Sequence, residues 1–203
     1  MLLLLTNIVI TVFNILRKRY IMNNLVCSFF GHRKINVTPE LKQKITDIVE
    51  DFIINHNVSI FLFGSRSEFN YLCHLVVTEL KKKYPKIKRI LYTCKNETCV
   101  LESEREKLEK IYSSVCNKEV HLLGVEQEYE HRTKFIAGKA SYVERNQAMI
   151  NDSDYCVFYY DKNYQLDIKR YSKYDVRCYQ PKSGTALAYA YAKQKKKVLF
   201  NIL

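Results

Sequence analysis

The sequence predicts an α/β fold of the doubly wound type, with a mainly parallel β-sheet and helices on both of its faces. Two observations support this prediction. Short apolar segments alternate along the chain with longer segments that carry one apolar face, which is the pattern of strands joined by covering helices. The chain also has 203 residues, 47% of them hydrophobic, which is enough for one domain with a substantial core.

The first part of the predicted domain has strands joined by two helices. Thr38 and Pro39 begin the first helix, because threonine is a favourable N-cap and proline fits the first helical turn. Apolar residues then recur every three or four positions as far as Ile53. The second helix runs from about Ser67 to Lys83, and Pro85 ends it. The strands are apolar segments at residues 25–30, 58–63 and 87–93.

The second part of the chain is less regular. Its clearest signals are an aromatic, apolar segment up to Tyr160 and an N-cap serine, Ser183, ahead of a helical pattern. The predicted elements are a charged helix at 102–113, a strand at 119–123, a loop or short helix at 127–137, a helix at 141–151, a strand at 154–160, a loop at 161–182, a helix from 183 to about 195 and a strand at 197–202.

The chain is strongly basic, with a formal net charge of +12. This balance favours anionic partners, such as nucleotides, phosphates, nucleic acid or a membrane surface, without choosing among them. The runs Lys81–Lys83 and Lys195–Lys197 are interpreted as solvated helix ends, where cations are favourable, in preference to a nucleic-acid patch. The sequence contains no Walker motif and no G-x-G-x-x-G, so ordinary NTPase and dehydrogenase functions are disfavoured.

The cysteine pattern predicts a reducing, cytoplasmic environment. The chain has seven cysteines, an odd number, and none are paired as C-x-x-C. Cys27 and Cys156 lie in apolar segments, where a free thiol behaves as a small hydrophobic group. Cys94 and Cys99 have no histidine near them in the sequence, which is a poor zinc pattern. No disulfide, metal or cofactor is predicted.

The amino-terminal residues 1–21 are predicted to be an extension of a single domain at residues 22–203. Their apolar part is short for a membrane span, and the basic residues come after it, opposite to a secretory signal. Three interpretations stay open: a marginal membrane anchor, a helix packed on the domain or a partner, or an upstream extension with synthesis starting at Met22. The last is favoured, and membrane association is not expected.

Two predicted strands end in similar triplets, Gly31-His32-Arg33 and Gly64-Ser65-Arg66. Parallel strands in such folds bind ligands at their carboxyl ends, glycine lets the backbone approach a ligand, and arginine suits phosphate or carboxylate. The alternative is that each glycine only makes a turn and each arginine is a surface residue. The repetition at equivalent points of one sheet favours a ligand site.

Two further segments carry polar groups that suit this site. Ser183-Gly184-Thr185 begins a predicted helix beside Lys182, where free amides and hydroxyls suit a phosphate, although Ser183 would also serve as a simple N-cap. In the segment 142–147, Arg145 and Asn146 either face the site or belong to a solvated helix face.

Taken together, four short motifs resemble the SLOG superfamily: Phe-Phe-Gly-His-Arg at 29–33, Phe-Gly-Ser-Arg-Ser-Glu-Phe at 63–69, Tyr-Val-Glu-Arg-Asn at 142–146 and Lys-Ser-Gly-Thr at 182–185. These Rossmann-like bacterial proteins are similar to the lonely-guy phosphoribohydrolases and the DNA-processing protein of natural transformation. The chain resembles in particular the small single-domain members of low-GC Gram-positive bacteria and their phages. The resemblance runs from about Met22 to the end.

The resemblance implies a six- or seven-stranded Rossmann-like sheet with a nucleotide-derived ligand at its carboxyl edge. Lonely-guy enzymes carry a catalytic glutamate three residues after the threonine of their Gly-Thr pair, and this chain has Ala188 there. Glu144 is then the best candidate for a catalytic group, with Glu68 as another. The ligand-binding residues implied are Gly31, His32, Arg33, Gly64, Ser65, Arg66, Arg145, Asn146, Ser183, Gly184 and Thr185.

The sequence leaves three functions open. The first is a binding module that senses or sequesters a nucleotide or nucleotide-like small molecule, which accounts for the basic charge and for Ala188. The second is a hydrolase of the N-glycosidic bond of a nucleotide, which needs a positioned acid or base. The third is a nucleic-acid-binding protein, for which the charge is permissive. A homo-oligomer is compatible with all three.

Overall fold

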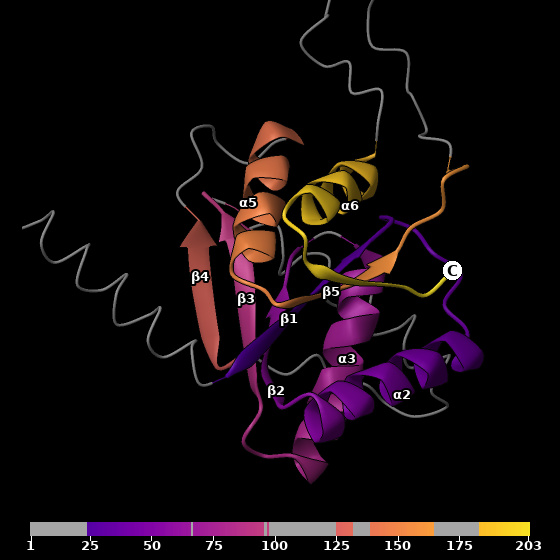
Figure 1. Ribbon diagram of the computed structural model, residues 1–203, viewed down its shortest axis with the longest axis vertical. Coiled ribbons are helices and arrows are strands. Elements are labelled where there is room, and N and C mark those ends of the chain that lie inside the picture. The colour runs from indigo at the N-terminus through magenta and orange to yellow at the C-terminus, as the bar shows by residue number, and fades with distance from the viewer. Residues whose placement is uncertain (1–23, 66, 96, 98–124, 132–138, 165–182) are drawn as a thin grey trace, which may run out of the picture.

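The computed structural model describes residues 24–65, 67–95, 97, 125–131, 139–164 and 183–203. Within them, six strands form one sheet in the order β4-β3-β2-β1-β5-β6, and every neighbouring pair is parallel (Figure 1). Helices cover both faces of this sheet. The prediction of a Rossmann-like, doubly wound α/β fold is therefore confirmed.

Most predicted elements have observed counterparts whose ends differ by no more than about two residues, as is usual for element boundaries. The strands are β1 (Leu25–Gly31), β2 (Val58–Phe63), β3 (Lys88–Cys94), β4 (Gln127–His131), β5 (Tyr155–Tyr159) and β6 (Val198–Asn201). The helices are α2 (Pro39–Asn55), α3 (Glu68–Lys83), α5 (Lys139–Asn151) and α6 (Gly184–Gln194). The helix predicted at 102–113, the strand predicted at 119–123 and the extension 1–21 lie outside the described residues.

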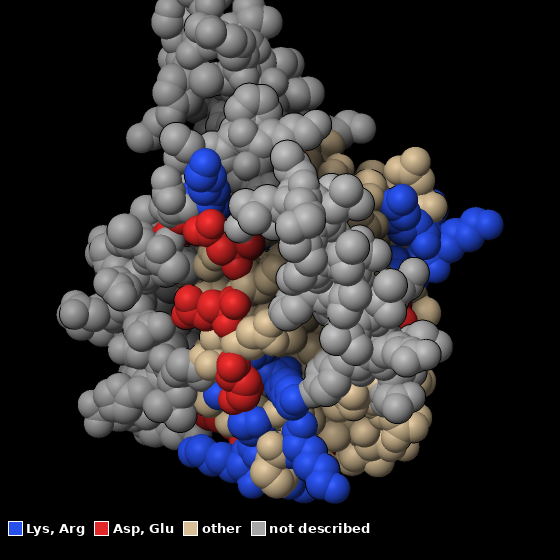
Figure 2. Space-filling view, turned by 90° about the vertical axis from the view of Figure 1, so that its left-hand side faces the viewer, with Lys and Arg blue, Asp and Glu red and all other residues tan. Residues whose placement is uncertain are grey.

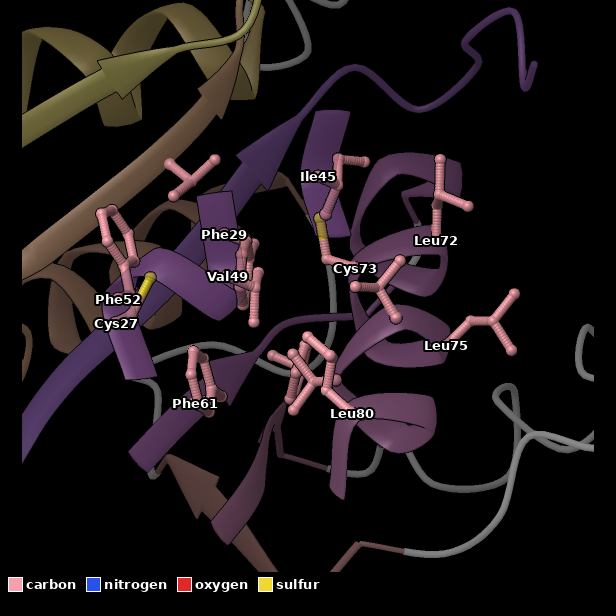
Figure 3. Close-up of a cluster of buried hydrophobic side chains, with 14 of the residues drawn as sticks. Cys27, Phe29, Ile45, Val49, Phe52, Phe61, Leu72, Cys73, Leu75 and Leu80 are labelled. Atoms are coloured by element: carbon pink, nitrogen blue, oxygen red, sulfur yellow. The ribbon is translucent and has the colours of Figure 1, made fainter. Parts of the chain in front are cut away.

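The helices are divided between the two faces of the sheet, as Figure 1 shows, with α2 and α3 on one face and α5 and α6 on the other. Successive side chains of a strand point to opposite faces of the sheet. In β1, Cys27 and Phe29 join the core under α2 and α3 (Figure 3), while Val26 and Phe30 join the core under α5 and α6. This period of two is the expected geometry of a strand buried on both faces.

Side-chain caps fix the starts of helices α2 and α6. The hydroxyl of Thr38 accepts a hydrogen bond from the amide of Leu41 at 3.2 Å, and the hydroxyl of Ser183 accepts one from the amide of Ala186 at 3.1 Å. Both N-caps were predicted from the sequence. Such a cap stabilises a helix by about 1 kcal/mol, so it sets where each helix begins.

Strand β4 is the element that the sequence misassigned, since a loop or short helix was predicted for 127–137. Its residues are polar, and Glu128 and Glu130 are exposed. Figure 2, which faces the β4 side of the molecule, shows acidic side chains gathered there above a group of basic ones. Charged side chains on an edge strand discourage pairing with another chain, and they hide the apolar alternation by which a strand is recognised.

An ion pair at the start of β4 explains its position. The buried guanidinium of Arg89, on β3, donates to Glu126 through Nη2 at 2.7 Å and through Nε at 3.2 Å. The same guanidinium donates to the hydroxyl of Thr78 on α3 at 2.7 Å. The Glu126 carboxylate also accepts the backbone amide of Arg89 at 2.6 Å. This clamp holds the start of β4 against β3 and α3.

Replacing Glu126 with glutamine is expected to remove an acid-sensitive part of the stability. Burial by itself raises the pKa of Glu126, but the hydrogen bonds and charge of Arg89 outweigh it and lower the pKa to about 2. A carboxylate whose pKa is lowered by folding stabilises the fold at pH values above its pKa in the unfolded chain, here 4.5. This contribution is lost as the pH falls toward the pKa of the group in the folded protein.

Urea unfolding at neutral pH and at about pH 3 measures this effect. The Glu126→Gln variant should be less stable than the native chain at neutral pH, and the difference should shrink in acid. Glu128→Gln, an exposed change on the same strand, is the matched control. A difference that stays constant with pH would contradict the clamp.

The described cysteines Cys27, Cys73, Cys94 and Cys156 are buried and free. Burial raises the pKa of the Cys27 thiol well above its usual value, so this side chain packs as a neutral group. Cys99, Cys116 and Cys178 lie outside the described residues.

Among the described helices, none is both long and apolar enough to span a membrane.

Candidate functional site

The carboxyl ends of β1 and β5 mark the point where the direction of the sheet reverses. From β1 the chain adds β2, β3 and β4 on one side, and it then returns to add β5 and β6 on the other. Gly31 at the end of β1 pairs with Tyr159 at the end of β5. Helix α6 begins on the same side of the molecule as these strand ends (Figure 1). Ligands of doubly wound folds bind at such a reversal point.

The loop after β1 is fixed by the start of α3. The Ser67 hydroxyl lies within hydrogen-bond distance of the carbonyl oxygens of Gly31 (3.1 Å) and His32 (3.0 Å). The amide of Glu68 donates to the carbonyl of Arg33 at 3.0 Å, and the Glu68 carboxylate accepts the amide of Ile35 at 2.9 Å. Glu68 therefore holds this loop, which weakens its candidacy as a catalytic group. The side chain of Arg33 is exposed.

Asn70, which the sequence analysis did not single out, joins the ends of β1 and β2. Its side-chain amide donates to the carbonyl of Phe29 at 3.1 Å, and its oxygen accepts the amide of Gly64 at 3.0 Å. Asn70 is buried on the inner face of α3. An asparagine on the apolar face of a predicted helix was the signal available in the sequence, because buried polar groups need partners.

The three glycines of the candidate site differ in what surrounds them. A Cβ atom added to Gly31 would lie 2.4 Å from the Cβ of Phe69, so this glycine lets α3 pack against the end of β1. A Cβ added to Gly64 would lie 3.1 Å from the Arg145 guanidinium. A Cβ added to Gly184 would meet no atom of the described residues within 4 Å. Among the three glycines, only Gly184 has open space beside it in the described part of the chain.

Ser65 and Arg145 come together in a buried cluster with Glu97, a residue that the sequence analysis missed. Arg145 Nη1 lies 3.5 Å from Glu97 Oε2 and also donates to the Ser65 hydroxyl. That hydroxyl donates to the other Glu97 oxygen, and the amide of Cys94 donates to Glu97 Oε2 at 2.7 Å. The side chain of Arg145 is 5% exposed and that of Glu97 is 0% exposed. The charge of Arg145 is therefore balanced inside the protein.

Neighbours on α5 and β3 complete this cluster. Arg145 Nη2 donates to the side-chain oxygen of Asn146 at 3.0 Å, and the Arg145 guanidinium lies 5.1 Å from the centre of the Tyr142 ring. The cluster is buried, so its local dielectric constant is low. Burial raises the pKa of Cys94 to about 12, which the charge of Arg145 only partly offsets. The Cys94 thiol is thus neutral and unsuited to act as a nucleophile.

His32 lies at the end of β1 and is 2% exposed. Its Nε2 accepts the backbone amide of Asp161, from the segment after β5, at 3.0 Å. The ring of Tyr164 stacks on the His32 ring, with centres 3.7 Å apart. Burial lowers the pKa of His32, while the charge of the Asp161 carboxylate opposes this to a smaller extent. His32 therefore connects the ends of β1 and β5 as a neutral imidazole.

The remaining predicted site residues lie at the start of α6. Ser183 is its N-cap, Gly184 its first residue, and Thr185 is buried. Ala188, the counterpart of the lonely-guy glutamate, packs in the core under α5 and α6. One position further on, Tyr189 stacks on Tyr160 with ring centres 4.8 Å apart. Helix α6 is thereby attached to the segment that follows β5.

The predicted site residues thus form two groups at one edge of the sheet. His32, Ser183, Gly184 and Thr185 lie around the ends of β1 and β5 and the start of α6, whereas Gly64, Ser65, Arg145 and Asn146 lie at the end of β2 and on α5. Arg66 lies outside the described residues, and Glu144 is a half-buried residue of α5. No cluster of three potential metal ligands occurs within the part of the chain that is described.

Comparison with known proteins places this arrangement in context. The family model YpsA, described as the YspA SLOG family, matches residues 27–195. A search of curated protein sequences found no significant match. Among solved structures, the fold is similar to DNA processing protein A from Helicobacter pylori, studied for its single-stranded DNA binding mode. The TM-score is 0.50 at 17% identity, with 90% of this chain and 67% of that chain covered.

Proposed function

Because the chain belongs to the YspA SLOG family, we propose that it is a binding module for a nucleotide or nucleotide-derived ligand, which it senses or sequesters. The observation that carries this proposal is the start of α6, at the same edge as the ends of β1 and β5, where none of the described residues fills the space beside Gly184. Free amides at a helix N-terminus bind phosphate groups, and a ligand here would occupy the reversal point of the sheet.

The predicted residues divide into two roles in this proposal. Ser183, Gly184 and Thr185 bind the phosphate through backbone amides and hydroxyls, and the exposed Arg33 adds positive charge. Arg66, which follows Ser65 in the sequence, is proposed to do the same. The cluster of Ser65, Arg145 and Asn146, with its balanced charge, shapes the edge and is not itself the phosphate anchor.

Ligand binding is expected to stabilise the fold measurably. A ligand at about 100 times its Kd adds about 2.7 kcal/mol to the free energy of unfolding. The test is a thermal-shift panel with AMP, ADP-ribose, cyclic dinucleotides and inorganic phosphate. Gly184→Val should abolish the shift, because a branched side chain would fill the open space, and it should leave the fold intact.

Gln194→Val, at the exposed far end of α6, is the matched control and should retain the shift. No shift with any probe, or an unchanged shift in Gly184→Val, would overturn the proposal. The same incubations, analysed by chromatography, report on the hydrolase alternative. Release of free base would favour that alternative even though Ala188 stands at the position of the lonely-guy glutamate.

Nucleic-acid binding is the second candidate function. The net charge of +12 and the fold similarity to a protein studied for single-stranded DNA binding favour it. Contacts with a phosphate backbone release counterions, so affinity for an oligonucleotide would fall steeply with added salt. Strong, salt-sensitive binding of a single-stranded oligonucleotide, together with no mononucleotide binding, would select this function over the first.

A further inference from the structure

The two ring nitrogens of His32 have different roles. Nε2 accepts the backbone amide of Asp161 at 3.0 Å, and a ring nitrogen accepts a hydrogen bond only when it carries no proton. A neutral imidazole carries its one proton on the other nitrogen. The hydrogen-bonding pattern therefore places the proton on Nδ1, which makes Nδ1 a donor.

This donor is buried and lacks a partner among the described residues. In the described residues, His32 Nδ1 is one of the few buried side-chain nitrogen or oxygen atoms that have no hydrogen-bond partner. Buried polar groups are nearly always paired in native proteins, and an unpaired one costs about 1–3 kcal/mol. A ligand that brings an acceptor atom would remove this cost on binding.

The position of His32 fits a contact with the ligand. Side chains alternate at the end of β1, so Phe30 faces the core under α5 and α6, whereas the space beside Gly31 is filled by Phe69 of α3. The next residue, His32, lies near Tyr160, with ring centres 6.2 Å apart, and Tyr160 stacks on Tyr189 of α6. The His32 ring thus belongs to the side of the sheet on which α6 begins.

We infer that His32 donates a hydrogen bond from Nδ1 to an acceptor oxygen of the bound nucleotide, while Nε2 holds the segment after β5. This inference rests on the proposed function and makes His32 a residue that selects for an acceptor at this point of the ligand. The charged groups beside the ring are Asp161, whose backbone it binds, and Arg33, which follows it in the chain.

Two substitutions separate the roles of the two nitrogens. Glutamine places its side-chain oxygen near the position of Nε2 and keeps an acceptor for Asp161, but it has no donor at Nδ1. Asparagine places its amide near the position of Nδ1 and keeps a donor for the ligand, but it does not reach Asp161. The inference therefore predicts opposite effects for His32→Gln and His32→Asn.

The measurements are the melting temperature without ligand and the Kd for whichever probe of the panel binds the native chain. His32→Gln should keep the melting temperature of the native chain. It should bind the probe about tenfold more weakly, because one hydrogen bond to the ligand is lost. His32→Asn should lower the melting temperature and keep more of the affinity. Nitrogen-15 spectra of the imidazole should show the proton on Nδ1 in the native chain.

The outcomes distinguish this inference from the proposal on which it rests. If no probe binds the native chain, the proposed function and this inference fail together. If the probe binds His32→Gln as tightly as the native chain, or if the proton is found on Nε2, this inference alone fails. Equal losses of affinity in both variants would likewise overturn it, because they would indicate a general packing role.

Discussion

Replacing Glu97 with leucine is expected to lower the free energy of unfolding by about 3–5 kcal/mol, because it leaves a buried arginine without its counter-charge. Arg145 and Glu97 are paired at 3.5 Å, and their side chains are 5% and 0% exposed. Neither group regains water unless the structure opens. The single substitution therefore costs far more than the pair itself contributes.

A double-mutant cycle tests this expectation by urea unfolding. Glu97→Leu and Arg145→Met should each destabilise the fold strongly, while the double variant should recover much of the loss, since an apolar pair of similar volume needs no counter-charge. Glu128→Gln, on the exposed edge of the sheet, is the control and should change stability by no more than about 0.5 kcal/mol. Additive losses in the double variant would contradict a direct pair.

A methyl group at Gly31 is expected to cost about 1–3 kcal/mol, the usual range for overpacking a core. In Gly31→Ala the new Cβ would lie 2.4 Å from the Cβ of Phe69, which is far inside van der Waals contact. Phe69 is fully buried on α3, so its Cβ can move away only if the helix moves with it. Helix α3 would have to shift away from the end of β1.

Gly184→Ala is the matched control, because the same added methyl group meets no atom within 4 Å among the residues that the structure describes. Its effect should be neutral or slightly stabilising, since alanine is a better helix former than glycine. The free energies of unfolding of the two variants, measured side by side, check the prediction. Equal stability of the two variants would show that α3 does not pack on Gly31 as described.

Local pattern accounted for most of the fold. Strands β1, β2 and β5 are buried over most of their length, and they read as apolar segments in the sequence. The N-caps Thr38 and Ser183 each accept a hydrogen bond from an amide only three residues ahead. The edge that carries the candidate site residues also followed from the sequence, because parallel strands bring their carboxyl ends together. All of these features depend on neighbours along the chain or on a general rule of the fold.

Only the tertiary structure decided which polar groups meet across elements. Arg145 and Glu97 are 48 positions apart, and Arg89 and Glu126, which place the polar strand β4, are 37 apart. Periodicity reports which face of an element is buried, but it carries no information about which polar groups meet across elements. The sequence alone thus determined the architecture and the edge of the sheet at which we propose that a ligand binds. The balanced charge of Arg145, the packing role of Gly31 and the donor on His32 arise from long-range contacts, because a buried polar group is defined by the partners that the whole fold brings to it.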